Sequence, residues 1–403
     1  MGTSVLASVP DPDMTDASSR YACPACGGSL RDVFDGGELP VNVGIFPATR
    51  EAALAAPRGR ILLAHCATCG IVHNRAFDPD GRIFAPGYEV ALHHSETFRT
   101  FIETLALRLR DRFALDGKRI VEIGCGDGYL LKRLAALGAN DCVGIDPTIA
   151  RPGTVDVEAG RVRLVRDWFG PDHAEYAADF ACCLSVFEDI PRPGPFLLAA
   201  RRLVGERNAP LYLEVFNGWR AFEAGEVWSV HYEQCNYFSL DSLTRVLGRH
   251  GFRVEDAGTC YGGDQYLYVE ARADRPTELQ DDAQADVPET LPTFARRFDE
   301  QRDAWNRTLR DWRERGERVV AWGTGGKGIT FLNTVDSRDI AVVAEINPDK
   351  QGRHVPGTGQ LIVAPDALVE YQPDRIIVTN ALYRPEMEAQ ARALGLHAEF
   401  HVA

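Results

Sequence analysis

The sequence predicts an α/β protein with a doubly wound parallel sheet, preceded by a small cysteine-bearing module and followed by a second α/β unit. Three observations support this. Apolar runs alternate with helical segments from Gly117 to Val215. Glycine-rich turns follow apolar runs at 124–128 and again at 323–328. Two Cys-x-x-Cys pairs lie before both turns, a spacing typical of a metal site.

The first glycine turn belongs to the central segment. Arg119 to Ile123 predicts a buried strand, and Gly124, Gly126 and Gly128 predict a sharp turn that brings the backbone close to a ligand. The next apolar run ends in Asp146, where an acid can accept both hydroxyls of a ribose. The pattern predicts a site for a nucleoside-containing cofactor.

Two classes of cofactor fit that site. A dinucleotide site usually carries G-x-G-x-x-G at a helix start that faces a pyrophosphate. Here Glu122 precedes the turn and Asp127 lies inside it, and acids suit a cation better than a pyrophosphate. S-adenosylmethionine (SAM) has an ammonium, a sulfonium and no phosphate. The stretch resembles motif I of the class I methyltransferases; the alternative is an ordinary strand–turn–helix.

Bulk composition limits the partners. The chain has 403 residues, which predicts two or three domains, and a net charge of −14, which argues against nucleic acid or an anionic membrane surface. No stretch approaches the ~20 apolar residues of a membrane span. Residues 1–19 lack the features of a signal peptide and predict a disordered lead-in. We expect a cytoplasmic protein.

The amino-terminal segment carries Cys23, Cys26, Cys66 and Cys69 as two Cys-x-x-Cys pairs. Four thiolates complete a tetrahedral zinc site and leave no open position, so the predicted Zn²⁺ is structural. A redox pair is the alternative. His65 and His73 are spare ligand candidates that we expect to face solvent.

A polar loop follows that module. Tyr88 and His93 precede a helix predicted from Glu96 to Phe113, and they are placed to cover the cleft of the next domain. The alternative is that they are surface polar residues.

The remaining central strands end in further candidate ligands. Strands are predicted at Val162–Val165, Phe180–Leu184 and Leu211–Val215. Their carboxyl ends place Asp167 and Trp168 at the adenine rim and Ser185 near the methionine part of SAM. Trp168 has a core aromatic as its alternative role.

Beyond the last of these strands, His231, Tyr232 and Glu233 can move protons among aromatic residues. A carboxylate in such surroundings gains pKa, which suits a general base. The alternative is a loop whose aromatics seat the helix predicted to start at Ser239.

The carboxyl-terminal segment repeats the strand–turn–helix pattern. A long helix is predicted from Phe294 to Arg315, and then a G-x-G-x-x-G turn that contains Lys327, which can hold a phosphate. Asn380 follows a later strand, and Arg353 lies in a glycine-rich loop suited to closing on a ligand. A docking domain without ligand is the alternative.

Together these features resemble the three-domain, zinc-containing, SAM-dependent C-methyltransferases of deoxysugar biosynthesis. The likeness also includes Tyr237-Phe238-Ser239 and the stretch from Asn347 to Gly352. It implies a methyltransferase domain at 88–272 and a Rossmann-like, substrate-binding domain at 293–403, with Asn347 among its contacts. The zinc module then spans 20–87 and a linker 273–292. A nucleotide-linked keto sugar from natural-product biosynthesis would lie between the two larger domains.

In that family a base removes a proton next to a ketone, and the carbon takes the methyl. Two histidines usual in the family are replaced here, one by Asp189 and the other by Gln234, whereas Glu233 is retained. We therefore predict Glu233 as base, with His231, Tyr232 and Asp189 as further candidates. The alternatives are methylation of O, N or S in a small metabolite, or a cofactor-binding protein without transfer activity. The sequence does not indicate an oligomeric state.

Overall fold

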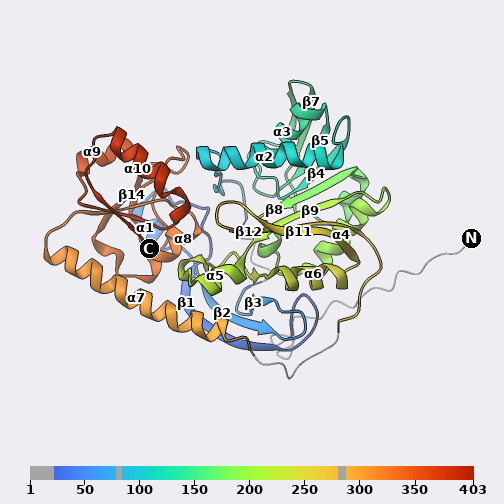
Figure 1. The fold of residues 1–403 in the computed structure, drawn as a ribbon. Coiled ribbons are helices and arrows are strands. Elements are labelled where there is room, and N and C mark those ends of the chain that lie inside the picture. The colour runs from blue at the N-terminus through green and yellow to red at the C-terminus, as the bar shows by residue number, and fades with distance from the viewer. Residues whose placement is uncertain (1–21, 79–83, 280–286) are drawn as a thin grey trace, which may run out of the picture.

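The computed structural model describes residues 22–78, 84–279 and 287–403. It contains sheets of four, eight and five strands. The five-stranded sheet and its helices lie beside the eight-stranded sheet, and the four-stranded sheet lies against both (Figure 1). Within the described ranges, no helix combines the length and the apolar character needed to cross a membrane.

The eight-stranded sheet is the centre of the chain. Its order is β11-β12-β9-β8-β4-β5-β7-β6, and the strands from β9 to β7 are parallel. Their bounds are β4 Arg119–Ile123, β5 Asp141–Ile145, β7 Gly160–Val165, β8 Phe180–Leu184 and β9 Leu211–Phe216. Antiparallel strands complete both edges: β12 Tyr266–Ala273, β11 Phe252–Cys260 and β6 Gly153–Val157.

Helices cover both faces of this sheet. They are α2 Glu96–Phe113, α3 Tyr129–Gly138, α4 Pro193–Gly205 and α6 Leu240–Arg249, whereas the short helix α5 Gly218–Ala224 places Phe222 in a separate apolar cluster with Phe34 and Phe294. Strand β4 shows the result, because Val121 and Ile123 pack in one apolar cluster and Ile120 packs in another. Burial on both faces explains why Ile120 and Val121 are apolar at consecutive positions instead of alternating with polar residues.

The carboxyl-terminal sheet is entirely parallel, in the order β15-β14-β13-β16-β17. The strands are β13 Val319–Trp322, β14 Ile340–Ala344, β15 Leu361–Val363, β16 Arg375–Val378 and β17 Glu399–Val402. Helices α8 Gly326–Thr334, α9 Leu368–Tyr371 and α10 Arg384–Ala393 connect them. The strand order reverses next to β13, which is where α/β sheets bind ligands.

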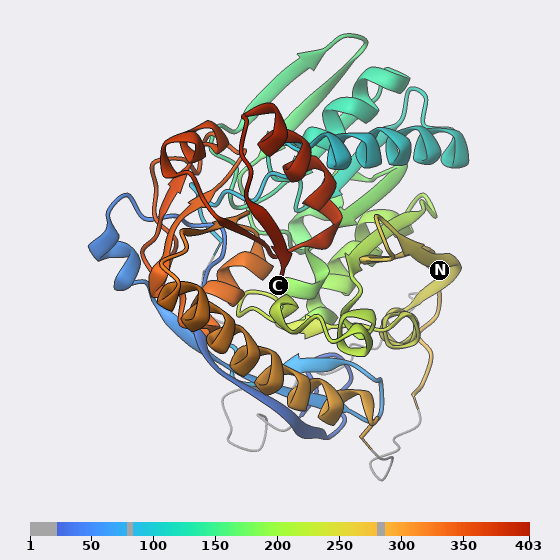
Figure 2. The same cartoon turned by 60° about the vertical axis from the view of Figure 1, so that its left-hand side comes forward.

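The amino-terminal sheet is not built from one segment. Strands β1 Leu30–Pro40, β2 Arg58–Cys66 and β3 Val72–Asn74 pair with β10 Asn236–Tyr237, which comes from the central segment. A short helix, α1 Arg50–Leu54, lies between β1 and β2. Helix α7 Thr290–Glu314 runs along this sheet (Figure 2), where Phe294 and Phe298 place ring centroids 5.4 and 4.9 Å from that of Phe34.

Two predictions about organisation need correction. The predicted linker 273–292 overlaps regular structure at both ends, because β12 extends to Ala273 and α7 already begins at Thr290. The amino end of α7 packs Leu291 and Phe294 into the apolar core, so a segment that looked polar is an ordered helix start. The predicted lead-in 1–19 lies outside the described residues, and the other domain boundaries remain predictions.

Candidate functional site

One large cavity, about 1110 Å³, lies at the carboxyl ends of both parallel sheets. Residues that follow β4, β5 and β8 line one wall, and residues that follow β13, β14 and β16 line the opposite wall. The loop before α2 and the segment from Ser229 to Gln234 supply the rest of the lining. Both places where strand order reverses therefore open into the same space.

The turn after β4 requires glycine for two different reasons. Gly124 has φ +73°, and a Cβ there would lie 2.2 Å from the side chain of Val186. Gly126 has φ +54°, and a Cβ there would meet nothing within 4 Å. The backbone at Gly126 is thus open toward the cavity, as a cofactor cradle needs.

Acids surround this turn. Asp146 Oδ2 accepts a hydrogen bond from Gly126 N at 2.8 Å, and its Oδ1 accepts from the backbone and hydroxyl of Thr148 at 2.7 and 2.6 Å. Glu122 is buried, and its Oε2 has no partner among the described residues. Burial, with the charges of Asp146 and Asp127, raises the pKa of Glu122 well above its ordinary value. An unsatisfied buried acid on the cavity wall fits a cationic ligand such as SAM.

Most of the predicted cofactor residues line this cavity. They are Glu122, Gly124, Gly126, Asp127, Asp146, Trp168 and Ser185. The alternative role of Trp168 as a core aromatic is wrong, because its side chain is 43% exposed. Ser185 lies directly after β8 with φ +51°, so the strand ends in a sharp turn at the cavity.

Two predicted cofactor contacts do not line the cavity. Gly128 instead precedes α3 as its N-cap with φ +77°. Asp167 accepts from Trp168 N at 2.8 Å and lies 3.5 Å from His173, so its carboxylate is held away from the predicted adenine rim. The turn after β7 directs Trp168 rather than Asp167 toward the ligand space.

Glu233 is held by two other segments of the chain. It is 2% exposed, its Oε1 accepts from the hydroxyl of Tyr88 at 2.6 Å, and its Oε2 accepts from Val43 N at 3.0 Å. Burial raises the pKa of Glu233 to about 7, against the opposing effect of both hydrogen bonds. A carboxyl on the cavity wall with that pKa suits general-base work near neutral pH.

The other predicted proton-transfer groups separate into two sets. Asp189 and His231 line the cavity; the pKa of Asp189 is raised by burial and nearby acids, and burial lowers that of His231 to about 4. Tyr232 does not line it. Its ring stacks on Phe77 at 5.0 Å and its hydroxyl accepts from Asp78 N, so a catalytic role for Tyr232 is contradicted by its orientation.

The histidines near the amino-terminal module occupy two environments. His93 lines the cavity and stacks on Tyr129, with ring centroids 4.6 Å apart. His65 and His73 are buried, so the expectation that they face solvent is wrong. His73 Nδ1 lies 2.9 Å from Asn236 Oδ1, and this contact ties β3 to β10. Sequence proximity to a Cys-x-x-Cys pair did not reveal that pairing between strands.

The predicted substrate-binding residues differ in whether their side chains already have partners within the protein. Lys327 lines the cavity, but its Nζ is 2.6 Å from Glu226. Arg353 also lines it, is exposed, and has no side-chain partner within the described ranges. Asn380 lines it and donates to Gln265 at 3.3 Å. Asn347 does not line the cavity; its amide donates to Glu89 at 2.9 Å, so it supports the wall instead.

Buried polar atoms without partners concentrate at this cavity. Within the described part of the chain there are ten, and seven belong to cavity-lining residues: Glu122, Glu188, Ser229, His231, Gln234, Trp322 and Gln390. Natural proteins leave few such atoms, so this concentration indicates a site completed by a polar ligand. Sequence reasoning missed Glu188, which lies in the turn after β8, and Glu214, which lies within β9. The available signal was an acid inside or just after an apolar run.

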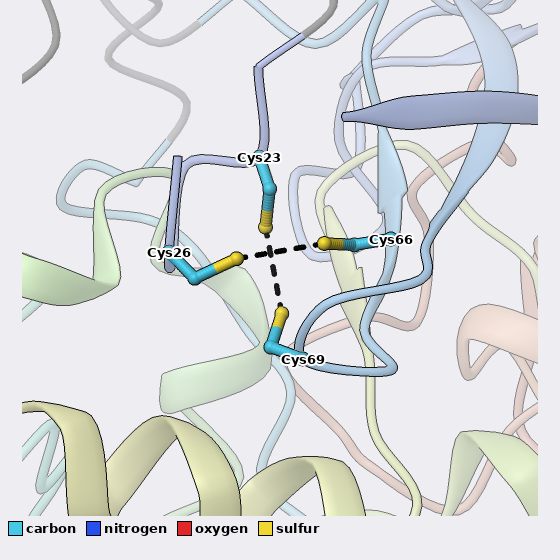
Figure 3. A group of neighbouring side chains, drawn as sticks. All are labelled: Cys23, Cys26, Cys66 and Cys69. Carbon is cyan, nitrogen blue, oxygen red and sulfur yellow. Dashed lines mark hydrogen bonds between the residues drawn. The ribbon is translucent and has the colours of Figure 1, made fainter. Parts of the chain in front are cut away.

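The four cysteines of the two Cys-x-x-Cys pairs meet in space (Figure 3). The sulfurs of Cys23 and Cys69 are 3.6 Å apart, those of Cys26 and Cys66 are 3.5 Å apart, and all four lie within 4.8 Å of one another. Zinc–sulfur bonds of about 2.3 Å predict tetrahedral edges of roughly 3.8 Å, so the donor set fits Zn²⁺. A zinc ion there would crosslink the module and supply no open coordination position.

Two family models match the chain. A methyltransferase domain matches residues 95–257, and a C-methyltransferase C-terminal domain matches residues 268–400. The C-methyltransferase NovU of Streptomyces niveus is 25% identical over 296 residues, which are 68% of this chain and 68% of that protein.

O-methyltransferases are also similar to part of the chain. The ubiquinone biosynthesis O-methyltransferase of Rhodopseudomonas palustris strain BisA53 is 28% identical over 205 residues, 46% of this chain and 78% of that enzyme. The chain spans a smaller share, 59%, of the enzyme of that name from strain TIE-1, which is 28% identical and matches 36% of this chain.

Solved structures resemble the methyltransferase part only distantly. Magnesium protoporphyrin IX methyltransferase from Synechocystis PCC 6803 has a TM-score of 0.33 and 16% identity, over 45% of this chain and 84% of that one. PH0226 from Pyrococcus horikoshii has a TM-score of 0.35 and 14% identity, over 45% and 92%. Likeness at this level carries no argument about chemistry. The matched methyltransferase model, together with the sheet order, shows that the chain is a SAM-dependent methyltransferase of class I fold, and residues 268–400 are similar to a C-methyltransferase C-terminal domain.

Proposed function

We propose that this protein transfers a methyl group from SAM to a carbon next to the ketone of a nucleotide-linked keto sugar or a related small metabolite. The observation that carries the proposal is Glu233, a buried carboxyl on the cavity wall with a pKa raised to about 7 and fixed by Tyr88 and Val43. Removing a proton from carbon next to a ketone requires such a positioned base.

The charges of the cavity support a cationic donor on one wall. The part of the cavity wall from residues 88–272 carries eight acids and two bases, Lys132 and Arg151; the acids are Glu89, Glu122, Asp127, Asp146, Glu188, Asp189, Glu214 and Glu233. A cation placed beside these acids favours their ionised forms, so the wall suits a ligand that bears an ammonium and a sulfonium. We propose that Gly124, Gly126 and Asp146 hold SAM there, with Glu122 facing its positive groups. When bound, SAM supplies the electrophilic methyl group.

The opposite wall has a different balance. The carboxyl-terminal unit lines the cavity with three bases, Lys327, Lys350 and Arg353, and three acids, Glu345, Asp349 and Glu386. Lys350 lies 3.8 Å from Glu345 and Lys327 pairs with Glu226, which leaves the Arg353 guanidinium for a ligand. Arg353 and Asn380 are therefore our proposed contacts for the anionic part of a nucleotide sugar, and residues 293–403 the substrate-binding domain.

The proton path follows from the contacts of Glu233. Ionised Glu233 takes the proton from carbon, and the hydroxyl of Tyr88 stabilises the carboxylate that does so. Val43 N fixes the second oxygen from the amino-terminal module, so the proposed zinc site acts on the base only through the position of that backbone. Asp189 is a second acid on the same wall, whose raised pKa disfavours its charge beside Glu233.

A second candidate function is methylation of a hydroxyl group. The similarity to ubiquinone biosynthesis O-methyltransferases favours it, and Glu233 could equally remove a hydroxyl proton. The C-methyltransferase C-terminal domain favours carbon. A cofactor-binding protein without transfer activity is the third reading.

A transfer assay separates these functions. The full-length protein is incubated with methyl-labelled SAM and a panel of nucleotide-linked 4-keto sugars, and the product is mapped by NMR. A new carbon-bound methyl that disappears in Glu233→Gln supports the proposal. A methyl on oxygen supports the second candidate. Binding of S-adenosylhomocysteine without transfer to any member of the panel would contradict the assignment to keto sugars.

A further inference from the structure

We infer that Gln234 is a catalytic residue that donates a hydrogen bond from its side-chain amide to the substrate's ketone oxygen as that oxygen becomes negative. The inference rests on the proposed C-methylation and names the group that stabilises its intermediate. Neither the matched families nor the sequence analysis assigns this role; glutamine at this position stood out only as a residue unable to act as base.

Gln234 and its neighbour Glu233 both face the cavity, which is unusual for adjacent residues. The chain bends at Tyr232 and Glu233, and as a result both Glu233 and Gln234 line the cavity although consecutive residues of an extended strand would face opposite ways. Gln234 is 3% exposed. The amide therefore lies beside the proposed base on the same wall.

The carboxamide of Gln234 has no hydrogen-bond partner among residues 22–78, 84–279 and 287–403. Its Nε2 is enclosed and unbonded, and its Oε1 makes no hydrogen bond to these residues either. Leaving a buried donor unsatisfied costs about 1–3 kcal/mol. A ligand oxygen that accepts this hydrogen bond removes that destabilisation.

The surroundings explain why a neutral donor is needed. Glu122, Glu188, Asp189 and Glu214 share this wall, so negative charge that develops on a substrate oxygen meets acids rather than a basic side chain. A carboxamide donates without titrating and cannot take the proton that Glu233 removes. The Nδ1 of His231 is the other unbonded nitrogen of this segment, but its ring lies against Gly326 on the opposite wall.

The step balances as follows. The C–H bond next to the ketone breaks, its proton goes to the Glu233 carboxylate, and its electron pair forms the carbon–carbon double bond of an enolate. The ketone oxygen takes the negative charge and accepts the N–H of Gln234. The ketone re-forms as the same carbon bonds the methyl group; the methyl–sulfur bond breaks, and its electron pair stays on sulfur to give the neutral thioether.

Proton exchange tests this role apart from methyl transfer. A thymidine diphosphate-linked 4-keto-6-deoxy sugar is incubated in D₂O with protein and S-adenosylhomocysteine, and loss of the hydrogens next to the ketone is followed by NMR. We expect the wild type to catalyse exchange and Gln234→Leu to slow it roughly 100- to 1000-fold, as for loss of an oxyanion donor. Gln234→His, which restores a donor, should stay within about tenfold of wild type.

Controls separate chemistry from folding. Gln301→Leu removes a glutamine that bonds Gly225 O outside the cavity, and it should exchange at the wild-type rate. Affinity for S-adenosylhomocysteine should be unchanged in Gln234→Leu. If that variant does not fold, near-isosteric Gln234→Glu replaces it, and it should lose at least as much because an anion then faces the enolate.

Three outcomes would overturn the inference. Exchange at the wild-type rate in Gln234→Leu or Gln234→Glu shows that the amide does not act. If His231→Leu loses exchange and Gln234→Leu retains it, the hydrogen-bond donor is His231. A wild-type protein that binds the sugar and S-adenosylhomocysteine but exchanges no proton contradicts the proposed carbon acid chemistry itself, and the inference fails with it.

Discussion

The two glycine turns of this chain use the same backbone device with different side chains. Each follows the strand at which its sheet reverses order, and each places the next strand's terminal acid on a turn amide. Asp146 accepts from Gly126 N at 2.8 Å, and Glu345 accepts from Thr324 N at 3.0 Å. Both turns line the one large cavity.

The difference lies in what satisfies the acids. At the first turn, Glu122 has an unbonded oxygen and no basic partner in the part of the chain that the structure describes. At the second, Glu345 also receives the hydroxyl of Thr324 and lies 3.8 Å from Lys350, so these groups lower its pKa although burial acts to raise it. The acid of the first turn thus lacks a partner that a cationic ligand can supply, whereas the acid of the second turn already has its partners within the protein. Similar folds do not imply similar ligands.

The largest effect is expected from Glu345→Gln. Lys350 is 3% exposed, so the change leaves a buried ammonium without its carboxylate and costs about 3 kcal/mol of unfolding free energy. Asp146→Asn removes no buried ion pair and should instead weaken S-adenosylhomocysteine binding. Denaturant unfolding and calorimetry on both variants check this. Equal effects of the two changes on cofactor affinity would contradict the distinction between the turns.

Alanine in each turn comes next. Gly124→Ala imposes φ +73° on a residue with a Cβ 2.2 Å from Val186, which costs about 2 kcal/mol and abolishes the cofactor cradle. Gly325 has φ −73° and open space around it, so Gly325→Ala should change stability by less than about 1 kcal/mol. Thermal melting and calorimetry measure both. A tolerated Gly124→Ala would break the comparison.

The two walls should also respond to pH in opposite ways. Burial raises the pKa of Glu188 to about 7 and that of Glu214 to about 8, above the ordinary glutamate value. The folded state then binds more protons than the unfolded state, so the free energy of unfolding falls as pH rises from about 4.3 through the folded pKa. The fall is about 1.4 kcal/mol for each unit by which the folded pKa exceeds the unfolded pKa. Glu345 has a lowered pKa, so its contribution is present above the unfolded value and is lost on acidification.

Unfolding curves between pH 3 and pH 8 test this. Relative to wild type, Glu188→Gln and Glu214→Gln should become more stable as pH rises from about 5 to 8. The stability difference between Glu345→Gln and wild type should stay constant over that range and shrink only below about pH 4.5, where the wild type loses the contribution of Glu345. Each substitution also alters hydrogen bonds. That change shifts the free energy of unfolding by the same amount at every pH, so it does not affect the slope of stability against pH. Parallel pH profiles for all three variants would count against the opposite roles of the walls.

The smallest effect concerns the second wall's cations. Arg353→Met should weaken binding of thymidine diphosphate about tenfold, because its guanidinium is free to meet a phosphate. Lys327→Met should weaken it less, since the Lys327 ammonium already pairs with Glu226. Titration calorimetry gives both constants. A larger loss from Lys327→Met would mean that the ligand displaces the pair with Glu226.

Local patterns predicted much of the molecule. Helix Glu96–Phe113 and strands Arg119–Ile123 and Phe180–Leu184 have the predicted bounds, because apolar period and caps are local properties. The four cysteines cluster as their spacing predicts. The start of α7 and the solvent exposure of His65 and His73 were predicted wrongly, and the ring contact of Tyr232 with Phe77 was not foreseen, because each depends on partners far away in the chain.

The sequence alone determined the class of each element and the chemistry available at each strand end, since glycine, acid and cysteine spacing act within a few residues. Only the tertiary structure decided which groups share the cavity and which are already satisfied. Glu233 meets Val43 across 190 positions, and Lys327 meets Glu226 across 101. Whether a charged group is free for a ligand depends on such contacts, and no local pattern encodes them.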